Sequence, residues 1–257
     1  MAEEERQTKY TIAEGFELPS RGKIYDVEVN PHVELRSMTA RDEMKRLSPS
    51  STQFKKLADI IEGCMIEKPK VHVYDMALGD YEFLLHKLRI VTYGPEYKMS
   101  VQCPHCLSSF EQNTSLNQLQ VLEFDEEKFN ECRTIKLPVS GDTIRLKFQT
   151  PHMLDDIDIQ VREAKRKYRN ADIDFDLLYL LKSIIDEVNG EKMDPLKLEG
   201  YIDKLPAKDT IKLVNAIDKL NACVGLDSTL FLDCPSCGGE VKTFFRFGPE
   251  FFRPTNI

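Results

Sequence analysis

The order of hydrophobic and polar residues predicts an extended N-terminal segment followed by amphipathic helices. Residues 15–38 contain short alternating runs interrupted by proline and glycine, a pattern typical of extended structure or a hairpin. Hydrophobic residues then recur at helical spacing, and we expect helices beginning at Thr39, across 54–65 and from 80 to 91. The pair Gly94-Pro95 ends the last of these helices.

The second half of the chain predicts a hairpin, then helices, then a final β segment. Residues 134–151 alternate on both sides of Ser140-Gly141-Asp142, as the strands of a hairpin do. Residues 152–169 carry acids early and bases late, an order that complements a helix dipole. A mostly apolar helix is expected at 175–188, closed by the Asn-Gly pair that follows it, and Pro206 opens another.

These patterns predict an α+β fold with small β-hairpins, divided into five consecutive segments. The segments are a disordered tail (1–14), a β segment with helices (15–98), a cysteine turn with a hairpin (99–150), a helical subdomain (151–226) and a second cysteine turn with an aromatic tail (227–257).

Composition and charge narrow the class of protein. The 257 residues are 41% hydrophobic and 30% charged, which is typical of a folded soluble protein. The net charge of −8, from 35 basic and 43 acidic residues, repels a phosphate backbone unless basic residues gather on one face. We find neither a membrane-length apolar run nor an apolar signal region, and we therefore expect a reducing, cytoplasmic setting without a membrane partner.

Two Cys-Pro-x-Cys turns carry the strongest chemical signal in the sequence. Cys103 and Cys106 form the first pair, and Cys234 and Cys237 form the second. A two-residue gap lets both sulfurs of a tight turn face one ion, and two such turns complete a tetrahedral shell. The four residues therefore predict one structural Zn²⁺ per chain, with no open coordination position for catalysis.

The spacing of the two turns is unusual because 127 residues separate Cys106 from Cys234. A compact zinc ribbon has roughly 15 to 20 residues there, so we expect a split ribbon with the helices inserted between its halves. Redox dithiols or unliganded turns are the alternative, and His105 is a further candidate ligand whose place inside the turn points it away. The remaining cysteines are expected to be small buried residues: Cys64, Cys132 and Cys223.

Other chemistry has little support in the sequence. We find no nucleophile elbow, metalloprotease helix or phosphate-binding loop, and the five histidines share no ligand spacing, so we expect no enzyme and no small-molecule substrate. The basic run Arg162 to Arg169 is read as a solvated helix end, with anion or RNA contact as the alternative. The C-terminal phenylalanines 244, 245, 247, 251 and 252 either pack within the chain or form an interface, for which Phe251 and Phe252 are the candidates.

The sequence resembles the baseplate hub and assembly protein family of contractile-tailed bacteriophages. The resemblance is carried in order by LPSRGKIY, ELRSMTARDE, the block from Tyr81 to Cys106 and LPVSGDTIRLKFQTPHMLDDI, and it ends with the second cysteine turn. It implies a non-enzymatic tail protein made in the infected bacterial cytoplasm that contacts other tail or baseplate proteins and is present in the virion baseplate or acts during its assembly.

A zinc-ribbon nucleic-acid-binding protein is the alternative from another class. In that case the ribbon hairpins and the run Arg162 to Arg169 would contact phosphates, and binding would fall steeply with salt. The sequence leaves open the copy number, the partners contacted and the choice between zinc and iron.

Overall fold

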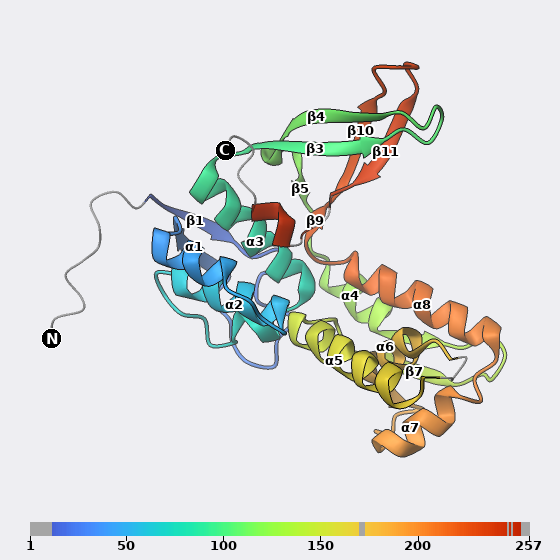
Figure 1. The fold of residues 1–257 in the computed structure, drawn as a ribbon. Coiled ribbons are helices and arrows are strands. Elements are labelled where there is room, and N and C mark those ends of the chain that lie inside the picture. Colours follow the sequence, from blue (N-terminus) through green and yellow to red (C-terminus); the bar gives the residue numbers. More distant parts are fainter. Residues whose placement is uncertain (1–11, 170–172, 246, 248, 253–257) are drawn as a thin grey trace, which may run out of the picture.

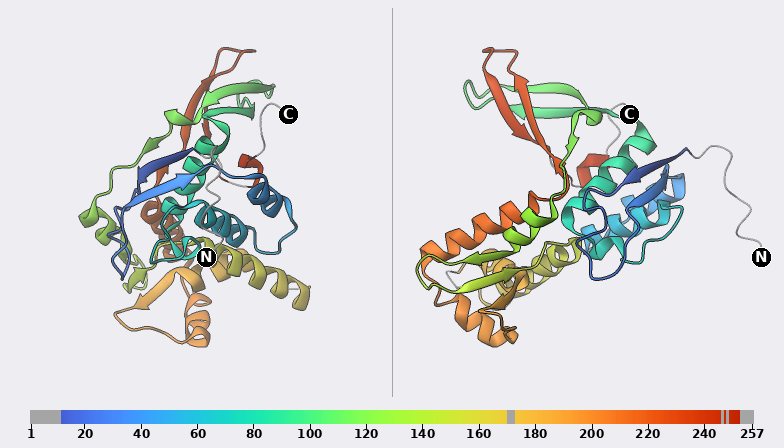
Figure 2. Two further views of the ribbon diagram at one scale, coloured as in Figure 1. Left: turned by 90° about the vertical axis from the view of Figure 1, so that its left-hand side faces the viewer. Right: turned by 180° about the vertical axis from the view of Figure 1, so that it is seen from behind.

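The computed structural model describes residues 12–169, 173–245, 247 and 249–252. The fold is α+β, as predicted, and combines helices with small antiparallel sheets. Figure 1 shows three parts: helices α1 to α3 with the β1 strand, helices α4 to α8, and two crossed hairpins above them. The two further views show the hairpins extending away from both helical parts (Figure 2).

The N-terminal unit joins one hairpin to three helices. The predicted start at Thr39 is confirmed, because Thr39 and Asp42 form a capping box in which each side chain bonds the other's backbone. The predicted hairpin is also present, with β1 antiparallel to β2. The elements are β1 (Ala13–Glu17), β2 (His32–Arg36), α1 (Ala40–Leu47), α2 (Gln53–Cys64), a 3-10 turn (Val73–Asp75) and α3 (Leu78–Tyr93).

The middle unit packs helices on a three-stranded antiparallel sheet ordered β6-β7-β8. The predicted hairpin of residues 134–151 supplies β6 and β7, and four helices follow it. Helix α4 was not predicted. The elements are α4 (Glu126–Arg133), β6 (Thr134–Lys136), β7 (Thr143–Leu146), α5 (Pro151–Lys167), α6 (Phe175–Ile184), β8 (Ile185–Val188), α7 (Pro195–Ile202) and α8 (Ala207–Asn221).

The helix predicted over 175–188 is wrong at its C-terminal end. It stops at Ile184, and β8 then pairs with β7. Asn189 and Gly190 have φ of 53° and 82°, and Val188 and Glu191 exchange backbone hydrogen bonds across them. The pair is thus the central dipeptide of a hairpin turn rather than a helix cap, a reading that an Asn-Gly pair after apolar residues also permits.

The remaining strands form the two hairpins and a short stalk below them. The stalk pairs Gln120 with Asp227 and Val121 with Leu226, so the middle unit is inserted between β5 and β9. The elements are β3 (Glu96–Gln102), β4 (Ser109–Ser115), a 3-10 turn (Leu116–Gln118), β5 (Gln120–Val121), β9 (Leu226–Asp227), β10 (Thr229–Asp233), β11 (Glu240–Phe244) and a 3-10 turn (Pro249–Phe252).

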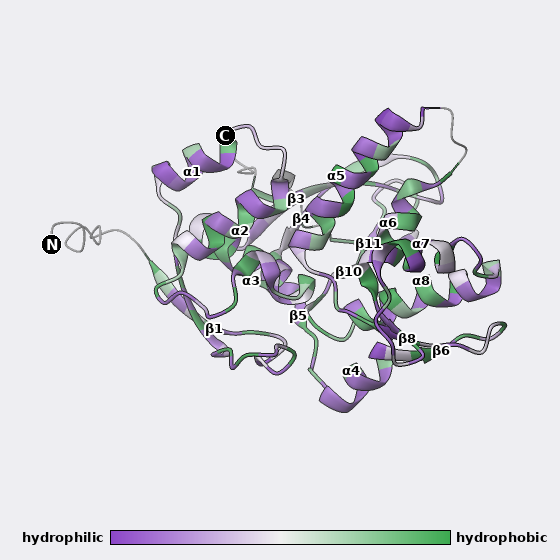
Figure 3. Ribbon diagram, turned by 90° about the horizontal axis from the view of Figure 1, so that it is seen from below, coloured by the Kyte–Doolittle hydropathy of each residue, from purple (hydrophilic) through white to green (hydrophobic). Residues whose placement is uncertain are grey.

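Two large hydrophobic clusters form the cores of the two helical units. The N-terminal cluster also contains residues from the end of the chain: Leu230, Phe245, Phe251 and Phe252. The second cluster combines residues 124–146 with 181–224 and also includes Ile24 and Ala77 from the N-terminal unit, so the predicted boundary between 150 and 151 runs through one core. The short peripheral helices α1 and α4 are mostly in the hydrophilic colour (Figure 3).

The predicted disordered tail, residues 1–14, falls mainly outside the described residues, which begin at 12. Strand β1 already begins at Ala13, so the last two residues of that segment belong to the first hairpin. In the described part of the chain we find no helix with the length and apolar character needed to cross a membrane.

Three buried aspartates join segments that are far apart in the sequence. Asp80 accepts hydrogen bonds from the Ser20 N–H (2.9 Å), the Ser20 hydroxyl (2.5 Å) and the Tyr25 hydroxyl (2.6 Å). Asp155 accepts from the Lys55 N–H at the start of α2 (2.8 Å), and Asp209 accepts from two N–H groups of the β6–β7 turn. Because a buried carboxylate needs such donors, each aspartate fixes one tertiary contact.

The two helical units meet at a close crossing of backbones. Gly79, in the first turn of α3, lies against the connection from α8 to β9, and a Cβ on it would stand 2.0 Å from the Val224 carbonyl oxygen. Gly225, with φ of +126°, would in turn place a Cβ 2.9 Å from the Gly79 Cα. Only glycine permits this approach.

We expect Gly79→Ala to lower the free energy of unfolding by about 2 kcal/mol or more, because the methyl group forces two backbones apart. Chemical denaturation of the purified protein measures this change. Gly63→Ala in α2 is the matched control, because nothing lies within 4 Å of its Cβ position; it should be neutral or stabilise by up to about 1 kcal/mol. Equal stability of the two variants would contradict the crossing.

Candidate metal centre

The two Cys-Pro-x-Cys turns have the same backbone hydrogen bonds, although they lie far apart in the chain. In the first turn, the Cys103 N–H donates to the Ser108 carbonyl (2.9 Å) and the Leu107 N–H donates to the Cys103 carbonyl (2.9 Å). In the second turn, the Cys234 N–H donates to the Gly239 carbonyl (3.0 Å) and the Gly238 N–H donates to the Cys234 carbonyl (2.8 Å). The turns connect β3 to β4 and β10 to β11.

The fifth residue of each turn adopts a left-handed backbone conformation. Gly238 has φ of 70°, and its counterpart Leu107 has φ of 61°. Glycine takes this conformation without steric cost, whereas a leucine is strained in it. Leu107 is also highly exposed, so burial of its side chain does not explain the strain. The geometry of the first turn is therefore held by its surroundings.

The four sulfurs of the predicted site are brought together. All four Sγ atoms lie within 4.8 Å of one another, with Cys103 to Cys237 at 3.8 Å and Cys106 to Cys234 at 3.7 Å. A tetrahedron of sulfurs with metal–sulfur bonds of about 2.3 Å has edges of about 3.8 Å. The sulfur positions thus fit a tetrahedral metal ion, with each of these two distances joining one hairpin to the other.

Ser108 supports the thiolates from beside the cluster. Its hydroxyl lies 3.0 Å from Cys106 Sγ and 3.6 Å from Cys234 Sγ. Hydrogen bonding by Ser108 lowers the pKa of Cys106 and lowers the pKa of Cys234 to about 6. At Cys237 the Gly239 N–H favours the thiolate, yet hydrogen bonds to Cys106 and Cys234 raise the pKa to about 12. A metal ion entering the cluster would therefore displace protons.

His105 lies outside the sulfur cluster, as its position in the turn predicts. Its Nε2–H donates to the Glu240 carbonyl at the start of β11 (3.0 Å), and its ring lies over Gly239. The residue therefore links one hairpin to the other. Of the three other cysteines, Cys64 and Cys223 are buried as predicted, whereas Cys132 is partly exposed.

Phe251 and Phe252 are not presented to a partner. Each side chain is 1% exposed, and the Phe251 ring packs on Phe245 (5.3 Å between centroids) and Tyr97 (5.6 Å) within the N-terminal core. This corrects their choice as interface residues: the C-terminal segment returns to fill the core of the first unit. Exposed phenylalanines stand elsewhere, at Phe231 and Phe244 on the second hairpin.

The basic run at the end of α5 is partly neutralised within the chain. Arg162 pairs with Asp158 (3.0 Å) and Lys165 pairs with Asp176 (2.9 Å). These pairs fit the interpretation of the run as a solvated helix end.

The molecule is thus an α+β protein in which two hairpins hold a four-cysteine cluster. The model of the family described as T4 bacteriophage base plate protein matches residues 11–253. The chain therefore belongs to this family, which confirms the resemblance found in the sequence. No match was found among curated proteins or solved structures. Membership indicates a structural or assembly role in the phage tail, suggests a non-enzymatic protein and implies contacts with other baseplate proteins.

We expect the purified protein to contain one metal ion per chain, and Cys234→Ser to lose both the metal and solubility, because the remaining ligands cannot complete the shell. Elemental analysis of the soluble protein measures the metal. Cys132→Ser, a partly exposed cysteine outside the cluster, is the matched control and should keep the metal. A wild-type preparation that is metal-free and fully folded would defeat the metal-site model.

Proposed function

We propose that the chain is a non-enzymatic baseplate component or assembly protein whose two hairpins form a split zinc ribbon clipped by one structural zinc ion. The family match over 11–253 supports the tail role. The observation that supports a zinc ion joining the two hairpins is that all four Sγ atoms lie within 4.8 Å of one another. Two of them come from the turn that precedes the inserted unit in the sequence, and two from the turn that follows it.

A structural ion fits this cluster better than a catalytic one. Four thiolates fill a tetrahedral shell and leave no position for water or substrate. Cys103 and Cys234 are buried beneath the turns, whereas Cys106 and Cys237 are exposed, so metal can reach the sulfurs from solvent. Elemental analysis distinguishes zinc from iron, the other metal that four thiolates commonly hold.

Contacts with other baseplate proteins are proposed through the outer face of the second hairpin. Phe231 and Phe244 are 61% and 57% exposed, and Lys242 Nζ lies between them, 6.0 Å and 5.4 Å from the ring centroids. Exposed aromatic rings on a rigid strand pair are typical anchors of protein interfaces. The opposite face of this hairpin carries Val241 and Leu232 toward the first hairpin.

The proposed role predicts where the chain is found in infected bacteria. It is made in the host cytoplasm, and density-gradient fractions of lysed cells, analysed by peptide mass spectrometry, should contain it with tails or tail intermediates. Fixed stoichiometry in finished particles identifies a structural subunit of the virion, and restriction to intermediates identifies an assembly factor. Co-migration with nucleic acid alone would overturn the proposal in favour of the zinc-ribbon nucleic-acid-binding protein.

We expect the double variant Phe231→Ser, Phe244→Ser to reduce association with tail fractions at least about tenfold, because truncating a residue that anchors an interface costs about 2 kcal/mol or more. Metal content and thermal stability should be unchanged, since both rings are exposed. Leu196→Ser removes an 83% exposed apolar side chain from α7 and serves as the control. A double variant that associates like the wild type would exclude this face as the contact surface.

A further inference from the structure

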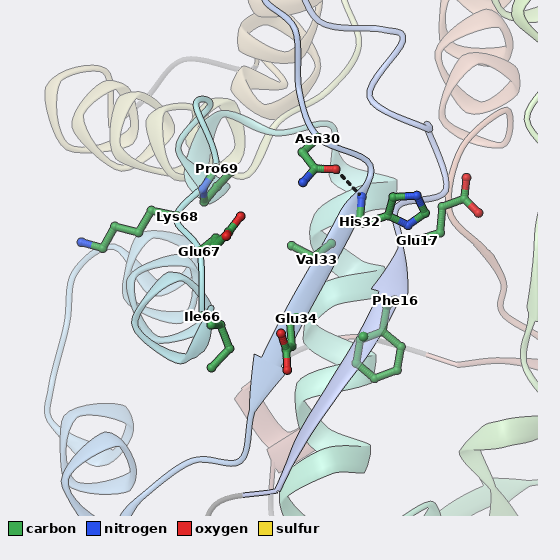
Figure 4. A pocket seen from close by; sticks show the side chains of 11 residues that line it. Phe16, Glu17, Asn30, His32, Val33, Glu34, Ile66, Glu67, Lys68 and Pro69 are labelled. Atoms are coloured by element: carbon green, nitrogen blue, oxygen red, sulfur yellow. Dashed lines mark hydrogen bonds between the residues drawn. The ribbon is translucent and has the colours of Figure 1, made fainter. Parts of the chain in front are cut away.

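A cleft lies along the outer edge of β2, far from the cysteine cluster. Its volume is about 550 Å³, and it is bounded by the hairpin β1–β2 on one side and residues 66–69 on the other (Figure 4). This size is within the range of sites that bind small ligands or short peptide segments.

The register of the hairpin determines which backbone groups face the cleft. At its two ends the Leu18 N–H donates to the Pro31 carbonyl (2.8 Å) and the Ser37 N–H donates to the Ile12 carbonyl (2.9 Å). In an antiparallel ladder every second pair of residues is joined by backbone hydrogen bonds. Counting from these two ends, Phe16 and Val33 form such a pair, so the backbone groups of Val33 point toward β1. The backbone groups of His32 and Glu34 therefore point away from β1.

The neighbouring segment pairs with only part of this outer edge. Ile66 donates to the Glu34 carbonyl (3.0 Å), and the chain then diverges from β2. The His32 N–H donates to the Asn30 side chain (3.0 Å). Within the described residues, the Glu34 N–H and the His32 carbonyl have no hydrogen-bond partner. This donor and this acceptor lie on either side of Val33. An added parallel strand would bond both groups through one of its residues, and an added antiparallel strand would bond them through two.

The walls of the cleft carry negative charge. Glu17, Glu34 and Glu67 are exposed, and none forms an ion pair with another described residue. Figure 4 shows the Glu67 carboxylate directed toward β2 and Lys68 extending away from the cleft. Ile66, 46% exposed, adds apolar surface. A partner that complements these walls is basic and presents some apolar side chains.

We propose that the outer edge of β2 binds an extended, basic segment of a partner protein by strand addition, with backbone bonds to Glu34 and His32 and cationic side chains beside Glu34 and Glu67. This site is separate from the metal cluster and from the Phe231 and Phe244 face. It provides a second contact surface that does not depend on zinc.

Fluorescence anisotropy with the full-length protein tests the proposal. The probe is a labelled, end-capped peptide of alternating lysine and valine, seven residues long, and we expect saturable binding of this peptide. A peptide with glutamate in place of lysine should not bind. A lysine–valine peptide methylated on its backbone nitrogens keeps the charge but cannot donate to the His32 carbonyl, and it should bind roughly tenfold more weakly.

Two variants locate the binding site. Glu34→Pro removes the outward N–H, a change that an edge strand tolerates, and Glu34→Lys reverses the charge; each should weaken binding roughly tenfold. Glu127→Lys, at an exposed position of α4, is the matched control and should bind like the wild type. Circular dichroism checks that all variants are folded. No binding of the basic peptide, or equal binding by Glu34→Pro and Glu127→Lys, would overturn the proposal.

Discussion

The fold depends on the return of the chain's C-terminal segment to the unit where the chain began. After the middle unit, β10 and β11 bring Cys234 and Cys237 beside the first cysteine turn, and Phe245, Phe251 and Phe252 then enter the N-terminal core. Closing a loop of this length costs conformational entropy, although the cost grows slowly with loop length. Burial of the aromatic rings offsets that cost. A metal ion bound by both turns would stabilise the closed loop further.

This return determines how the inserted unit is held. Residues 126–224 leave and rejoin the body through the two-residue pairing of β5 with β9 and through the crossing of Gly79 and Gly225. So short a stalk provides little stability alone, because few backbone bonds join it. Contacts between the units supplement it, including the Asp155 bonds from α5 to the start of α2 and the Leu78 N–H bond to Gln149 (2.8 Å). The orientation of the middle unit thus follows from a few close contacts.

Local patterns in the sequence predicted most helices, while contacts between distant segments had to be seen in the structure. The Thr39 cap, the stripe in α2 and the Gly94-Pro95 stop are local signals, and the structure has each of them. The sequence did not predict the end of α6, because residues 185–188 pair with β7 as a strand. This contact with a distant segment overrides the helix propensity of the residues. The burial of Phe251 and Phe252 was undecidable locally, because hydrophobicity alone does not distinguish a distant core from an interface. The set of four cysteines was predictable because the thiol ligands and the two-residue spacing within each turn indicate a shared ion, however many residues separate the two turns.

The position of the second cysteine turn also determines the order of events during synthesis. Cys234 is 128 residues beyond Cys106, so at 5–20 residues per second the ribosome needs about 6 to 26 s between them. Throughout that interval only two of the cluster's four cysteines have been synthesised, and the N-terminal core lacks Phe251 and Phe252. A nascent chain therefore exposes apolar surface until Phe251 and Phe252 emerge from the ribosome. A product that ends before Cys234 can complete neither the cluster nor the core, so it does not present the native surface.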